Sequence, residues 1–119
     1  MLALTRRIGQ TLRIGDDIRV TVRSRLRDLV LIDVSAPAGS HLYCEGMPQS
    51  GTHGGSGRER YLVPVMTGEC LQLGAVRIAI DGDRRCHGGQ IRLHVDAPRQ
   101  IAVTREELVG SPRRLRIAA

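Results

Sequence analysis

The sequence predicts an all-β protein, and three observations support this fold class. Apolar residues alternate with polar ones through most of the chain, which is the period of strands that bury one face. No stretch has a helical period longer than a single turn. The alternating pattern of the front half also returns in the back half, beyond a glycine-rich segment. The 119 residues therefore fit one structural domain built from two similar units.

The first predicted element is an antiparallel hairpin. In residues 18–22 and again in residues 30–34, apolar side chains occupy every second position, and a polar stretch at 24–28 joins the two runs. This pattern is typical of two strands that share one buried face. The one helical signal is a capping box, in which Thr104 precedes Glu107 by three residues. We expect little or no helix, at most a single turn near Thr104 to Val109.

The second hairpin repeats the first. The motif Gly-x-x-Leu-x-(Ile/Leu)-Gly at residues 9–15 returns at 68–74, and the apolar positions of 18–22 and 30–37 return at 76–80 and 91–98. A unit of about 45 residues rarely buries a sufficient core alone, whereas two packed units can, so we predict a pseudo-dimer. Its parts are repeat 1 at residues 1–45, a Gly/Ser-rich linker at 46–60, repeat 2 at 61–109 and a basic tail at 110–119.

The charge of the chain indicates its class of partner. All 18 basic residues are arginines, and the formal net charge is +6. Because arginine stays charged and offers a planar fork to phosphates, a polyanion is the expected partner. Phe and Trp are absent, so ring stacking on bases can contribute little. No apolar run approaches the ~18 residues of a membrane span, and we expect a cytoplasmic protein without membrane contact.

The cysteines and histidines do not indicate a metal centre or an active site. Three cysteines without a C-x-x-C pair favour reduced thiols over a disulfide framework or a zinc ribbon. No Ser/His/Asp or Cys/His set has a spacing that supports catalysis, so we predict no enzyme activity and no cofactor. A zinc site is the alternative, and it would draw on Cys86, His87, His41, Cys44 or His53.

Two motifs at opposite ends of the chain resemble one bacterial family. Residues 4–16, LTRRIGQTLRIGD, resemble the opening of the carbon storage regulator family, CsrA and its Rsm relatives, and residues 97–108, APRQIAVTREEL, resemble its last strand. The resemblance implies a tandem fusion of two interlocked CsrA-like repeats. They would form two mostly antiparallel five-stranded sheets in a barrel-like pseudo-dimer with a minimal C-terminal helix. Family members are homodimers that bind GGA motifs in RNA hairpin loops.

Each of the family's two RNA sites joins the first strand of one subunit to the last strand of its partner. In this chain the resemblance implies one complete site, from the first strand of repeat 1 and the last strand of repeat 2. Arg6, Arg99 and Arg105 would hold phosphates or guanine, with Arg105 central. Leu4 and Val103 would take base faces. The predicted RNA-binding residues are Leu4, Thr5, Arg6, Arg7, Arg92, Ala97, Pro98, Arg99, Ile101, Val103, Thr104 and Arg105.

The reciprocal site lacks these features. Residues 63–66 stand where residues 4–7 stand in repeat 1, so both arginines are missing and Pro64 removes a backbone donor. We therefore predict one working site per chain. The remaining replacements are Ala38 for Arg99, Ser40 for Ile101, Leu42 for Val103, Cys44 for Arg105 and Leu31 for Arg92.

The expected function is post-transcriptional regulation by a monomeric pseudo-dimer that binds GGA hairpins of an mRNA or small regulatory RNA. The linker leaves open whether the repeats pair within one chain or exchange between chains. The alternative function is a degenerate CsrA-like protein-interaction module, or an antagonist of CsrA-type regulators, without specific RNA binding. A protein antagonist of this chain is a further candidate partner.

Overall fold

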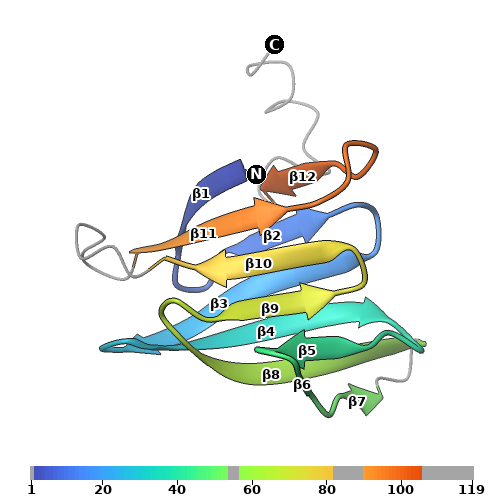
Figure 1. Cartoon of the computed structure of the whole chain (residues 1–119), viewed down its shortest axis with the longest axis horizontal. Helices are drawn as coiled ribbons and strands as arrows, with labels where there is room; N and C mark the ends of the chain where they lie inside the picture. The colour runs from blue at the N-terminus through green and yellow to red at the C-terminus, as the bar shows by residue number, and fades with distance from the viewer. Residues whose placement is uncertain (1, 54–56, 82–89, 106–119) are drawn as a thin grey trace.

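Antiparallel strands account for all the regular structure in the described part of the chain, residues 2–53, 57–81 and 90–105 of a computed structural model (Figure 1). The front half contributes β1 (Leu2–Arg7), β2 (Thr11–Ile14), β3 (Ile18–Leu26), β4 (Leu29–Pro37) and β5 (Leu42–Cys44). Two short strands follow, β6 (Met47–Pro48) and β7 (Thr52–His53). The back half contributes β8 (Arg58–Met66), β9 (Cys70–Leu73), β10 (Val76–Ile80), β11 (Gln90–Asp96) and β12 (Val103–Arg105).

The strands form two sheets, and each sheet takes strands from both halves. Sheet A has the order β1-β11-β10-β9-β5-β6, and sheet B has the order β12-β2-β3-β4-β8-β7. The strands β1 to β5 correspond, in chain order, to β8 to β12. When each strand of sheet A other than β6 is replaced by its counterpart, the strand order becomes that of sheet B without β7. The predicted all-β class and the interlocked antiparallel sheets are confirmed. Each sheet has six strands rather than five, and the sheets stay open instead of closing into a barrel.

The predicted hairpin is the pair β3 and β4. Val20 lies opposite Val34 and Val22 opposite Ile32, and a register shift follows between Val22 and Ser24. The motif shared by the two halves includes a glycine that ends a strand in each. Gly9 after β1 and Gly68 after β8 have φ values of 90° and 91°, a backbone conformation that side chains with a Cβ rarely adopt. This requirement explains why glycine is present at both positions.

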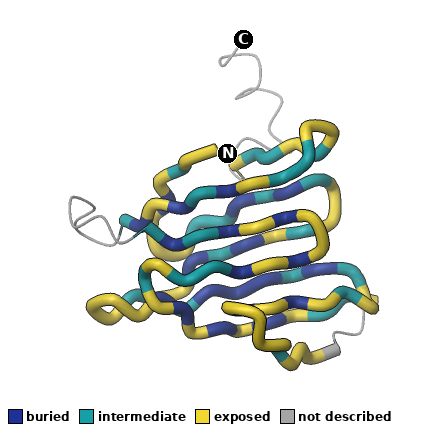
Figure 2. The backbone as a smooth tube through the Cα atoms, in the orientation of Figure 1, coloured by how far each residue is buried: buried dark blue, intermediate teal, exposed yellow. Residues whose placement is uncertain are grey.

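The core lies between the two sheets and is made of the alternating apolar residues. Figure 2 shows buried positions alternating with exposed ones along the strands. Leu12 and Ile32 of sheet B and Leu71 and Leu93 of sheet A are fully buried. Each such side chain contributes about 1.5–3 kcal/mol of burial free energy. The two halves therefore share one core, since both sheets contain strands of both halves.

The segment predicted as a flexible linker contains regular structure. β6 pairs with β5 and β7 pairs with β8, and β8 itself begins at Arg58, inside the predicted linker. A strand edge offers backbone N–H and C=O groups that any neighbouring extended segment can satisfy, whatever its side chains. Composition alone therefore misses these strands. They are also the sixth strand of each sheet.

Thr104 and Arg105 lie in strand β12, so the helical turn predicted from Thr104 does not begin there. The rest of that turn, the tail at 110–119, and Cys86 and His87 of the zinc alternative lie outside the described residues. Within the described residues, no group of His, Cys, Asp or Glu side chains is arranged to hold a metal ion. The same residues include no helix that is long and apolar enough to cross a membrane.

Candidate nucleic-acid interface

Two strands from opposite ends of the chain come together at one end of the molecule. β1 is the edge strand of sheet A and β12 the edge strand of sheet B, and both lie near the N-terminus in Figure 1. Among the described residues, β1 pairs only with β11 and β12 pairs only with β2. Each of them therefore has one backbone edge without a partner strand in the described structure. We call the space between them the edge cleft.

Both strands turn matching sets of side chains toward this cleft. In β1, Leu4 and Arg6 lie opposite Leu93 and Ile91, whose side chains are in the core, so they share the inner face of sheet A. In β12, Val103 and Arg105 lie opposite the buried Ile14 and Leu12 and share the inner face of sheet B. A cavity of about 250 Å³ joins the two walls. It is lined by Leu2, Val95, Ala97, Pro98, Arg99, Ile101 and Val103.

Arg6 connects the two sheets beneath the cleft. Its side chain is 2% exposed, and its Nη2 donates a hydrogen bond to the carbonyl oxygen of Thr11 at 3.3 Å. Thr11 begins β2, and its neighbour Leu12 lies opposite Arg105. Arg6 therefore contacts β2, the strand whose Leu12 lies opposite Arg105, and a shared role of the two arginines in RNA binding stays a prediction. The buried guanidinium group of Arg6 therefore has a structural role, whereas the side chains of Arg99 and Arg105 are exposed.

Four of the predicted residues point away from the cleft. Thr5 and Arg7 in β1 and Arg92 in β11 lie on the outer face of sheet A, where Thr5 is opposite Arg92. The Nε of Arg92 lies 4.0 Å from the Oδ2 of Asp81. Thr104 lies on the outer face of sheet B, opposite Arg13. The structure thus divides the predicted set between the cleft and the two outer faces.

One residue of the cleft was missed by sequence reasoning. Leu2 is 42% exposed and lines the cavity together with Arg99 and Val103. The signal was present, because Leu2, Leu4 and Arg6 occupy alternate positions and must share one face of a strand. The prediction began at Leu4 because the family motif begins there.

The opposite end of the molecule holds the counterpart of the edge cleft, and there both edges are covered. The strands that correspond to β1 and β12 are β8 and β5, and they are paired on their outer sides by β7 and β6. We call this region the covered end. Val65 takes the place of Arg6 and is fully buried, and Cys44 takes the place of Arg105 and is also buried.

Tyr61 occupies the position at the covered end that Leu2 occupies at the edge cleft. Its ring is 2% exposed, and a Cβ placed on Gly51 would lie only 2.9 Å from the ring carbon Cε1. Its hydroxyl lies 2.7 Å from the carbonyl oxygen of Ser40 and 2.6 Å from Oε2 of Glu59. Burial, together with the hydrogen bond to Glu59, raises the pKa of Tyr61 to about 12. Linker backbone thus packs against a ring at the point where the edge cleft has a cavity.

The thiol of Cys44 is held in its neutral form at the same end. Burial raises its pKa above the ordinary value, and the carboxylates of Glu69 and Glu45 add to the effect. A neutral, buried thiol has neither the charge nor the donor geometry of the arginine that stands at the corresponding place in β12. The covered end therefore presents no cation at the position of Arg105.

The fold and the edge cleft define an all-β protein of two interlocked sheets, with a cleft formed by strand edges from the two ends of the chain. Residues 1–44 match the family model of CsrA, described as the global regulator protein family. A translational regulator CsrA of Hydrogenovibrio crunogenus is 51% identical over 37 residues, which cover 31% of this chain and 53% of that protein. The N-terminal 44 residues of this chain are thus similar to the CsrA family.

These matches cover only part of this chain and part of the relative. The chain spans about half the length of that relative, and the family match ends at residue 44. The resemblance of residues 97–108 to the family's last strand therefore stays a prediction from sequence. A search of solved structures returned no match.

Proposed function

We propose that this chain is a post-transcriptional regulator that binds a GGA motif in an RNA hairpin loop through the edge cleft. The observation that carries the proposal is the meeting of β1 and β12. Leu2 of β1 and the segment from Arg99 to Val103, which are nearly a hundred positions apart, line one cavity. The similarity of residues 1–44 to the CsrA family supports RNA as the ligand class.

The chemistry of the cleft suits a loop of splayed bases. Leu4 and Val103 are partly buried apolar side chains on facing walls, and they can support base faces where the chain has no Phe or Trp. Arg99 and Arg105 are exposed and can hold phosphates or the O6 and N7 atoms of guanine. The strand edges can offer backbone N–H and C=O groups to base edges. Arg6, being buried, would support the cleft rather than contact RNA.

The proposal includes one site per chain, in a fused pseudo-dimer. At the covered end the strand edges are paired with β6 and β7, and Val65 and Cys44 replace the two arginines. The pairing of the strand edges and the replacement of the arginines both occur at the covered end, and both disfavour the binding of nucleic acid there. A one-site molecule cannot bridge two GGA hairpins of one message, so it would lack the avidity that a two-site dimer gains from effective concentration.

A gel shift at controlled salt tests the proposal. The probe is a short hairpin with GGA in its loop, and its control is the same hairpin with the loop sequence scrambled. We expect tight retention of the GGA hairpin only, because base contacts specify and phosphate contacts do not. Native mass spectrometry should show one RNA per chain. Equal retention of both hairpins would contradict sequence-specific binding, and a 1:2 protein:RNA complex would contradict the single site.

The alternative function as a protein-binding module has one supporting observation. Leu29, Leu62 and Met66 are 39%, 60% and 46% exposed on the outer face of sheet B, and Leu29 lies opposite Met66. Neighbouring exposed apolar side chains are a feature of protein interaction sites. The gel shift separates the two functions, because a protein-binding module would show only weak retention of both hairpins that disappears as salt rises.

A further inference from the structure

The outer faces of the two sheets differ in charge. Among the described residues, the strands of sheet B turn one acid outward, Asp33, and five arginines: Arg13, Arg19, Arg23, Arg58 and Arg60. The outer face of sheet A has a smaller excess, with Arg7, Arg77 and Arg92 against Asp96 and Asp81; Arg77 lies opposite Asp96 and Arg92 lies near Asp81. The larger excess of positive charge among the described strands is therefore on the outer face of sheet B. The edge cleft does not account for it, because these arginines lie on the far side of sheet B from the core.

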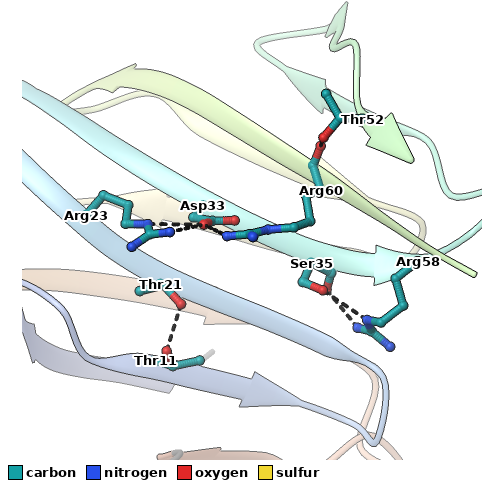
Figure 3. A network of polar contacts seen from close by, with 8 residues as sticks. All are labelled: Thr11, Thr21, Arg23, Asp33, Ser35, Thr52, Arg58 and Arg60. Atoms are coloured by element: carbon teal, nitrogen blue, oxygen red, sulfur yellow. Dashed lines mark hydrogen bonds and ion pairs between the residues drawn. The ribbon is translucent and has the colours of Figure 1, made fainter. Parts of the chain in front are cut away.

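Asp33 holds two of these arginines in fixed positions. Its carboxylate is 9% exposed, and its Oδ2 accepts from Arg23 at 3.1 Å and from Arg60 at 2.5 Å (Figure 3). The two arginine side chains stay about half exposed. One carboxylate shared by two guanidinium groups leaves a net positive charge and N–H donors that the acid does not use. The contact with Asp33 raises the pKa of Arg60, which keeps it charged at any working pH.

A polar cavity of about 320 Å³ lies beside this group. It is lined by Thr11, Arg19, Thr21, Asp33, Ser35 and Arg60. The hydroxyl groups of Thr11 and Thr21 lie 2.7 Å apart, and the hydroxyl of Ser35 accepts a hydrogen bond from Nε of Arg58 at 2.9 Å. The lining thus combines two guanidinium groups and three hydroxyl groups, which are groups that bind phosphates, with one carboxylate, Asp33, that is already paired with Arg23 and Arg60.

The corresponding cavity on sheet A lacks this set of guanidinium and hydroxyl groups. A cavity of about 230 Å³ there is lined by Cys70, Arg77, Ala79, His94 and Asp96, which stand where Thr11, Arg19, Thr21, Asp33 and Ser35 stand in sheet B. One arginine remains, and Asp96 brings a carboxylate into the position of the Ser35 hydroxyl. No arginine of that lining corresponds to Arg60. The two cavities share a backbone framework but only the one on sheet B suits an anion.

We propose that the sheet B cavity binds a phosphate of the RNA backbone that flanks the loop, on a path that begins at the edge cleft. This inference rests on the proposed function and extends it to the nucleotides outside the GGA motif. Thr104 of β12 lies opposite Arg13, which lies opposite Arg19, and the row continues through Ser35 to Arg60. Neighbouring strands are about 4.8 Å apart, so the row is about 19 Å long. Asp33 is a positioning residue for Arg23 and Arg60.

The experiment compares a short GGA hairpin with the same hairpin carrying about six unpaired uridines on its 5′ or its 3′ side. We expect one extension to tighten binding to the unaltered chain about tenfold. The double variant Arg19→Ala/Arg60→Ala should lose that gain, while its affinity for the short hairpin stays the same. For the extended RNA, the slope of log affinity against log salt concentration should become shallower by about 0.7 in the double variant, since one phosphate contact on a single strand contributes about 0.7.

Two further variants make the result specific. Arg19→Ala alone leaves the contacts of Asp33 in place and should lose about half of the gain. Arg77→Ala removes the corresponding arginine of sheet A and should lose none. The inference is wrong if neither extension tightens binding, or if the gain survives in the double variant or disappears equally in Arg77→Ala.

A third RNA separates this inference from the proposed function. If the short hairpin fails to bind the unaltered chain, the proposed function fails. The cavity is then tested with an unstructured oligouridine at low salt. Stronger retention by the unaltered chain than by the double variant would support the cavity as a phosphate site, and equal retention would overturn it.

Discussion

The edge cleft and the covered end are the same arrangement of strands with opposite outcomes. At the edge cleft, β1 and β12 have edges without partner strands in the described structure, a cavity lies between them, Arg99 lines that cavity and Arg105 of β12 is exposed. At the covered end, linker strands pair with β8 and β5, and Val65, Cys44 and Tyr61 are buried. The comparison shows that a pair of sheet edges can be covered by a few residues of backbone. No change in the rest of the fold is needed.

The outer faces of the sheets show the same divergence on a smaller scale. The cavity with Arg19 and Arg60 on sheet B has a counterpart with Arg77 and Asp96 on sheet A. The backbone is alike and the side chains decide the charge. Among the described residues, both comparisons give more positive charge to the edge cleft and to the outer face of sheet B than to their counterparts.

The largest effect is expected from Arg6, which supports the edge cleft from inside. Arg6→Ala removes a buried side chain that bridges the sheets through the carbonyl of Thr11, and it should lower the free energy of unfolding by about 3 kcal/mol. Chemical denaturation measures this loss. Arg7→Ala, at the exposed next position, is the matched control and should change stability by less than about 0.5 kcal/mol. Equal effects would show that Arg6 does not hold the sheets together.

Arg105→Ala tests the contrast between the two ends directly. If Arg105 contacts guanine or phosphate, its loss should weaken binding of a GGA hairpin by about 1–3 kcal/mol, or roughly 5- to 150-fold. Cys44→Ala alters the corresponding position at the covered end and should leave the affinity within about twofold. Fluorescence anisotropy with a labelled hairpin measures both. An unchanged affinity in Arg105→Ala would remove the central contact of the proposed site.

Gly51→Ala tests how tightly the linker seals the covered end. The new methyl group would approach the Tyr61 ring to 2.9 Å, so the linker must shift, at a cost of about 1 kcal/mol. Thermal unfolding should show a lower midpoint, and hydrogen exchange should rise in β7 and β8 while β1 stays protected as before. Unchanged exchange in β7 would mean that Gly51 is not held against the ring.

The smallest effect is the pH dependence of the covered end. The raised pKa of Tyr61, about 12, lies above the ordinary value of 10.0, so the folded protein favours the neutral phenol. The stability that this provides is complete below pH 10 and is lost as pH rises through about 12. In a Tyr43→Phe variant Tyr61 is the single tyrosine, and its phenolate absorbance should appear with a midpoint near pH 12. A midpoint near 10 would show that the ring is accessible to water.

Much of the fold was predictable because it follows from local patterns. Alternation in residues 18–22 and 30–34 determines which face each residue presents, and this predicted the hairpin and its buried side correctly. The paired glycines, Gly9 and Gly68, marked equivalent turns. Part of the cavity lining was named from the sequence, since the resemblance pointed to Arg99, Ile101 and Val103 and these residues line it, while their role in RNA binding stays a prediction.

Residues 46–60 are where composition misled. Their glycines and serines indicate flexibility, yet Met47–Pro48 and Thr52–His53 pair as strands because neighbouring edges offer hydrogen-bond partners. The burial of Arg6 was also not predicted, and the reason is related. A charged residue in a strand motif is expected at the surface, and only the position of Thr11 in the other sheet provides the acceptor that accompanies its burial.

The sequence by itself determined which residues alternate, where the turns fall, that two similar units share a chain, and that arginine is concentrated in particular strands. These properties are local, since they depend on the steric and polar character of neighbouring residues. Only the tertiary structure decided that β1 meets β12, that linker strands cover β5 and β8, and that Arg19 and Arg60 flank one cavity. Those outcomes depend on strand pairing between distant segments, which is decided when backbone groups and apolar faces find partners during folding.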